Sequence, residues 1–194
     1  MEGLVIIIAV LYSIIFHELA HGYVADFLGD YTPRYSGRLT LNPIMHLDPI
    51  GSIMLPIFTF LTGGFIFGWA KPVPINPFNF KNPKRDMALV GIAGPLTNIV
   101  LALILALFFK LLLFLNIPLN QDIFFTIIRI NLILAIFNLL PIPPLDGSRV
   151  FLSFLPLEKQ IYLEQFGIIF IFIFIFFAFP LIIKIVDLLL NLIL

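Results

Sequence analysis

The chain has 194 residues, of which 61% are hydrophobic and only 11% are charged. A soluble domain uses about a quarter of its residues as charged ones, so this composition predicts an integral membrane protein. Eleven basic and eleven acidic residues give a net charge of zero, which argues against nucleic acid as a partner. The absence of cysteine excludes disulfides and thiolate ligands and leaves His, Asp and Glu as metal ligands.

The first apolar stretch predicts a transmembrane helix over residues 3–28. We expect it to stay attached, because it lacks the basic start and the small-residue cleavage site of a signal peptide. Near its end stands the pentapeptide His17-Glu18-Leu19-Ala20-His21. The polar stretch that follows, residues 31–40, alternates in hydrophobicity and predicts a short β-strand.

A second apolar stretch covers residues 50–69 but contains five helix breakers: Gly51, Pro56, Gly63, Gly64 and Gly68. These residues disfavour a straight helix and favour a re-entrant segment that enters the membrane and returns on the same side. The alternative is a segment that crosses the membrane.

Three later stretches predict spanning helices over residues 87–115, 122–140 and 161–179. Residues 180–194 follow Pro180 and are short for a full span, so an interfacial helix is equally compatible with them. The predicted fold is therefore an all-α polytopic membrane protein, a single membrane domain over residues 1–194. It has about four to five transmembrane helices, a re-entrant segment, and a short β element between the first two spanning helices.

The pentapeptide predicts a zinc site. On a helix His17 and His21 stand one turn apart on the same face, so both rings can reach one metal ion while Glu18 can address a bound water. A catalytic zinc ion usually takes three protein ligands, so another ligand must come from elsewhere. Asp146 is favoured because it follows a spanning helix and a proline-rich turn; His46 and Asp48 are the rivals.

A shared zinc ion would require Asp146 and the histidines to lie at one membrane depth. The helices over residues 3–28 and 122–140 must then run in the same direction, with residues 87–115 as the single net crossing between them. This topology places eight basic residues on one side: Arg34, Arg38, Lys71, Lys81, Lys84, Arg85, Arg149 and Lys159. By the positive-inside rule that side, to which the active site is closer, is cytoplasmic.

Three sequence elements, in this order, resemble the site-2 protease family of intramembrane zinc metalloproteases. They are His17-Glu18-Leu19-Ala20-His21, Gly94-Pro95-Leu96-Thr97-Asn98 and Asn138-Leu-Leu-Pro141-Ile-Pro143-Pro144-Leu145-Asp146-Gly147. The resemblance implies one Zn²⁺ per chain held by His17, His21 and Asp146, with Glu18 as catalytic acid and base. It also implies that Asn98 and Asn138 lie near the substrate.

Two further motifs are similar to the shorter bacterial branch of the family, which we expect without a PDZ domain. They are Gly37-Arg38-Leu39-Thr40-Leu41-Asn42-Pro43 and Gly68-Trp69-Ala70-Lys71-Pro72-Val73-Pro74. This resemblance implies an enzyme of the bacterial inner membrane that hydrolyses peptide bonds within or near transmembrane segments of other membrane proteins.

Other interpretations remain open at this stage. Asn98 and Asn138 could instead join helices, because membrane-embedded Asn often does so. His46 and Asp48 could form a second layer around the metal site or be ordinary loop residues. The cluster could also be a metal transit site in a transporter, or belong to a relative that binds membrane peptides without cutting them.

Overall fold

The computed structural model describes residues 2–63 and 70–194, apart from the side chains of residues 63, 157–158, 161, 164, 168–173 and 175–178. The longer helices are α1 (Glu2–Phe27), α3 (Leu55–Gly63), α4 (Pro83–Phe114), α5 (Gln121–Asn138), α6 (Asp146–Ser153) and α7 (Leu157–Ile193). The shorter ones are α2 (Thr32–Tyr35), η1 (Pro43–His46), the π-helical η2 (Pro49–Met54) and η3 (Pro77–Asn79).

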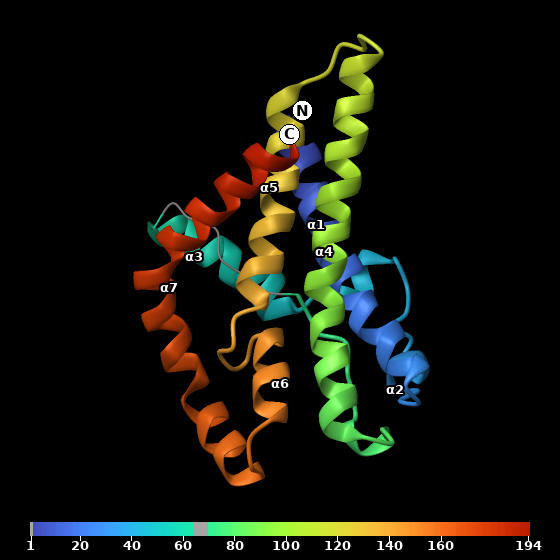
Figure 1. Cartoon of the computed structure of the whole chain (residues 1–194), viewed down its shortest axis with the longest axis vertical. Helices are drawn as coiled ribbons and strands as arrows, with labels where there is room; N and C mark the ends of the chain where they lie inside the picture. Colours follow the sequence, from blue (N-terminus) through green and yellow to red (C-terminus); the bar gives the residue numbers. More distant parts are fainter. Residues whose placement is uncertain (1, 64–69) are drawn as a thin grey trace.

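Among the described residues, α1, α4 and α5 are long and apolar enough to cross a membrane. Figure 1 shows that α1 and α5 run in one direction and that α4 runs in the opposite one. This is the arrangement that a common depth for His17 and Asp146 requires. The span expected over residues 161–179 lies within α7, where most side chains are outside the described set, so the total number of spans remains a prediction.

The helices pack around α4, which contacts both α1 and α5. Alanines on one face of α4 allow close approach of the neighbouring helices, as small residues do in membrane proteins. The resulting buried apolar cluster joins α4, α5 and α7 through Ala102, Ala106, Ile128, Leu132, Ile182 and Val186.

Helix α7 continues through Pro180, although the sequence predicted a span over residues 161–179 and a separate final segment. Proline bends a helix, and Figure 1 shows that α7 changes direction along its length. The part after Pro180 packs on α5 and belongs to the same buried cluster as Ala102 and Ala106 of α4. An ion pair of 2.9 Å between Arg129 Nη2 and Asp187 Oδ1 also joins this part to α5.

The predicted β-strand over residues 31–40 is wrong. The chain forms the short helix α2 there, because the Asp30 carboxylate accepts a hydrogen bond from the Thr32 backbone N–H and Pro33 suits the first turn of a helix. Gly37 then turns the chain with a φ of 66°, a left-handed conformation that glycine adopts without strain.

Segment 50–69 begins with η2 and continues into α3, which projects away from the helices α1, α4 and α5 (Figure 1). Residues 64–69 of this prediction lie outside the described residues. The two flanks of the segment are adjacent, because the Lys71 N–H donates a hydrogen bond of 2.9 Å to the His46 carbonyl. The residues just before and just after segment 50–69 therefore lie side by side.

Candidate metal centre

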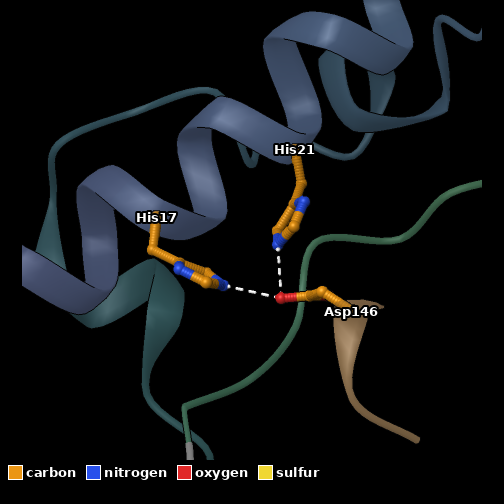
Figure 2. A group of neighbouring side chains, drawn as sticks. All are labelled: His17, His21 and Asp146. Carbon is orange, nitrogen blue, oxygen red and sulfur yellow. Dashed lines mark hydrogen bonds and ion pairs between the residues drawn. The ribbon is translucent and has the colours of Figure 1, made fainter. Parts of the chain in front are cut away.

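Two histidines from α1 and one aspartate from α6 converge on one point. Figure 2 shows the rings of His17 and His21 directed at the carboxylate of Asp146. Asp146 Oδ2 lies 3.0 Å from His17 Nε2 and 3.2 Å from His21 Nε2. All three residues are buried, and one potential ligand atom from each lies within 4.8 Å of the others. In the described part of the chain, this is the group of three that could hold a metal ion.

The proline-rich turn after α5 brings Asp146 to the histidines. Helix α5 ends at Asn138 and α6 begins at Asp146, so the carboxylate comes from the first turn of a new helix. The turn is tight at Gly147, where a Cβ would lie 2.1 Å from the Leu139 carbonyl oxygen. Only glycine fits such a close approach of two backbone segments.

The second nitrogen of each histidine ring is already bonded. His21 Nδ1 lies 2.7 Å from the Val90 carbonyl oxygen, which can only accept, so Nδ1 carries the proton. His17 Nδ1 lies 2.6 Å from Asn98 Oδ1 and donates in the same way. Both Nε2 atoms therefore present a lone pair to the point where the three side chains meet, as ligating histidines do.

The orientation of Asn98 is fixed by a buried polar network. Its amide nitrogen donates to the Ser13 carbonyl at 3.3 Å and to Asn131 Oδ1 at 2.9 Å, which leaves its oxygen for His17. Asn131 in turn donates to Ser13 Oγ at 3.0 Å. Asn98 and Asn131 are both fully buried. Neither Asn131 nor Ser13 was predicted from the sequence, although a polar residue inside an apolar span is a signal of function.

The space between the rings is kept open by Gly94. A Cβ at this position would lie 2.4 Å from His21 Nε2 and 2.5 Å from His17 Nε2. The residues present therefore fit a zinc ion: two imidazole nitrogens and one carboxylate oxygen form a three-ligand catalytic donor set. Such a set leaves a fourth position for water or substrate.

Glu18 is half-buried one residue from His17, and its Oε2 accepts a hydrogen bond of 2.8 Å from the Val73 backbone N–H. It is not part of the group of potential ligands.

The remaining predicted residues are placed elsewhere. Asn138 donates to the Leu134 carbonyl of its own helix at 2.9 Å. The buried His46 lies 2.8 Å from the Thr40 carbonyl through Nε2, and Asp48 accepts hydrogen bonds from the first turn of η2. Among the described residues, none of the three forms a hydrogen bond or ion pair with His17, His21 or Asp146.

Comparison with known proteins gives a family match over nearly the whole chain. The model of peptidase family M50 matches residues 5–120 and 120–181. The chain is 42% identical to YwhC of Bacillus subtilis over 186 residues, which cover 91% of this chain and 81% of YwhC.

More distant relatives extend this match to other organisms. MJ0611 of Methanocaldococcus jannaschii is 33% identical over 74% of this chain and 67% of its own length. Rip2 of Mycobacterium tuberculosis H37Rv is 30% identical over 83% of this chain and 62% of its own length. The names of YwhC, MJ0611 and Rip2 all contain the words zinc metalloprotease. No solved structure matches the chain. On the family match and the identity to YwhC, the chain belongs to peptidase family M50.

Proposed function

We propose that this protein is an intramembrane zinc metalloprotease that hydrolyses peptide bonds within or near transmembrane segments of other proteins. The observation that carries the proposal is the convergence of His17, His21 and Asp146 within a bundle of apolar helices, with both Nδ1 atoms already bonded. Three relatives whose names contain zinc metalloprotease support zinc as the metal and peptide hydrolysis as the reaction.

In the proposed mechanism, His17, His21 and Asp146 hold the zinc ion. Bound zinc supplies Lewis-acid polarisation and lowers the pKa of a coordinated water. Glu18 takes a proton from the attacking water and returns it to the leaving amine, which is general base and then general acid catalysis. Asn98 and Val90 keep the histidine rings in the tautomer that binds metal through Nε2.

The substrate is a transmembrane segment that can unwind, because a helix keeps its carbonyls bonded and shielded from attack. The buried site needs such a segment to enter between helices or along segment 50–69, which we propose is re-entrant. The adjacency of His46 and Lys71 supports this, since the flanks of a re-entrant segment must lie on the same membrane side.

We propose that the active site is closer to the cytoplasmic side of a bacterial inner membrane. The basic residues outside the apolar stretches lie at the same ends of the helices: between α1 and α4, in the first turn of α4, in α6 and in the first turn of α7. The turn between α4 and α5 has none. Cysteine labelling tests this cleanly, because the chain has no cysteine of its own. Lys81→Cys should react from the cytoplasm and Pro118→Cys from the opposite side; the reverse result would contradict the orientation.

The deciding experiment compares wild type with Glu18→Gln, which keeps the size of the side chain but removes the base. Both purified proteins are assayed for zinc content and for cleavage of single-span membrane peptides in detergent. The proposal expects zinc in both and cleavage by wild type alone. Cleavage by both proteins would remove Glu18 from the mechanism, and a wild type that binds no zinc would overturn the proposal. If the protein were a transporter or a peptide-sequestering protein, neither wild type nor Glu18→Gln would cleave the peptides.

A further inference from the structure

Two sequence motifs have no role in the proposed metal site, and the structure brings them together. They are the segment around Arg38 and the segment Ala70-Lys71-Pro72-Val73-Pro74. Arg38 is only 5% exposed, and its Nη2 donates to the Lys71 carbonyl at 3.0 Å and to the Pro72 carbonyl at 2.8 Å. A buried guanidinium that bonds two successive carbonyls holds a backbone rather than a ligand.

The chain over residues 70–76, which we name the strap, is held at both ends. At its start the Lys71 N–H donates to the His46 carbonyl at 2.9 Å. At its end the Asn76 N–H donates to Asp30 Oδ2 at 2.7 Å. The strap contains neither helix nor strand hydrogen bonds, so these contacts and those of Arg38 determine its position.

The middle of the strap contacts the proposed catalytic base. The Val73 N–H donates to Glu18 Oε2 at 2.8 Å, and the Val73 side chain is buried against α1 near Gly22. Pro72 and Pro74 flank Val73 and have no N–H. A shift of the strap by one residue in either direction would place a proline opposite Glu18, so the sequence Pro-Val-Pro allows the hydrogen bond in one register only.

We infer that the strap positions the carboxylate of Glu18 for catalysis through the Val73 N–H, and that Arg38 and Asp30 are positioning residues that hold the strap. This inference rests on the proposed role of Glu18 as the base. A free glutamate rotates about three side-chain bonds, whereas a carboxylate with one oxygen fixed presents its other oxygen in a restricted direction. Restricting a reacting group in this way is a recognised source of rate enhancement, and small misplacements of it are costly.

The backbone N–H can be removed without deleting the side-chain volume. Val73→Pro removes the N–H from a segment that already contains Pro72 and Pro74, and the residue before a proline favours the extended region that proline itself adopts. We expect Val73→Pro to lower kcat at least tenfold with KM changed less than threefold and with full zinc content. Val73→Ala keeps the N–H and loses only packing, so its kcat should fall less than about threefold.

Arg38 provides a second, independent test. Arg38→Gln should lower kcat as Val73→Pro does, and Arg38→Lys should recover part of the loss because an ammonium can still bond one carbonyl. Wild-type kcat in Val73→Pro or in Arg38→Gln would overturn the inference. A higher kcat in either variant would also overturn it, since the strap would then obstruct the base rather than position it.

A measurement that needs no proteolysis separates this inference from the proposed function. The single cysteine of Val73→Cys should react slowly with a maleimide, because position 73 is buried, and at least tenfold faster when Arg38→Gln is added. If Glu18→Gln cleaves as well as wild type does, the proposed base is wrong, whatever the labelling shows. If Glu18→Gln is inactive but labelling is independent of Arg38, the positioning inference alone fails.

Discussion

Asn98 Oδ1 of α4 lies 2.6 Å from His17 Nδ1 of α1, although the two residues are 81 positions apart in sequence. This hydrogen bond determines which nitrogen of His17 is free to bind metal. It also connects the proposed zinc site to the buried Asn131 and Ser13, so the ligand geometry depends on the packing of α1, α4 and α5.

Replacement of Asn98 should therefore weaken zinc binding. We expect Asn98→Ala to lower zinc affinity about 10- to 100-fold, the usual effect of losing the partner of a ligating histidine. Zinc affinity is measured by competition with a chelator. Asn138→Ala is the matched control for metal binding, because the Asn138 side chain bonds a carbonyl of its own helix. Equal affinities in the two variants would show that Asn98 does not orient His17.

Gly94→Ala should abolish zinc binding. The added Cβ would lie within about 2.5 Å of both Nε2 atoms, closer than any non-bonded contact allows, so the rings would have to turn away. Gly3→Ala, in the first turn of α1, has no atom within 4 Å of the added Cβ and should bind zinc normally. Zinc content of the two purified proteins, measured by atomic emission, checks this. Full zinc content in Gly94→Ala would mean that the metal is held elsewhere.

The Asp30 carboxylate should contribute to stability in a pH-dependent way. Burial opposes its ionisation, but the Thr32 hydroxyl, the Asn76 N–H, the Asn79 amide and the Thr32 N–H all donate to it. Together these hydrogen bonds hold the pKa of Asp30 below its ordinary value of 3.8. A carboxylate with a lowered pKa stabilises the fold above the pKa of the unfolded chain, and this contribution is lost as pH falls through the folded pKa.

We therefore expect Asp30→Asn to lower the apparent Tm at pH 7 by several degrees. The difference from wild type should stay constant down to about pH 4 and then shrink as the wild-type carboxylate becomes protonated. Thermal unfolding of both proteins in detergent from pH 3 to pH 7 measures this. Asp122→Asn, which changes an exposed carboxylate in the first turn of α5, is the control. A difference that grows toward low pH would contradict the assignment.

The ion pair between Arg129 and Asp187 should hold the end of α7 against α5. Both side chains are nearly half exposed, and α5 is apolar enough to cross a membrane. Removal of one partner leaves a charge unpaired beside lipid, so Arg129→Gln should destabilise by more than the roughly 0.2–1 kcal/mol of exposed pairs in water. The doubly substituted Arg129→Asp, Asp187→Arg protein restores the pair in reverse and should recover most of the loss. Apparent Tm values of the wild type, the single variants and the double variant complete the test. Additive losses would show that the two charges do not interact.

The membrane class, the M50 family and the ligand candidates could be predicted from the sequence because each depends on local information. Apolar runs report the length of a span, and the His17–His21 spacing places both rings on one helix face whatever surrounds them. The prediction of a β-strand over residues 31–40 was wrong because an alternating pattern forms a strand only where a second strand is present to pair with it. Here Asp30 and Pro33 favour a short helix instead.

The tertiary structure decided which distant residues meet. No spacing in the sequence indicates that Asn131 fixes Asn98, that Arg38 bonds the backbone beside Glu18, or that Asp187 pairs with Arg129. These contacts join segments 33 to 58 residues apart, and they depend on how the helices pack and where the loops between them return. The sequence by itself determined which metal ligands and which membrane-spanning helices the chain has, because these depend on the identity and local spacing of side chains. Their mutual arrangement follows only from packing the whole chain.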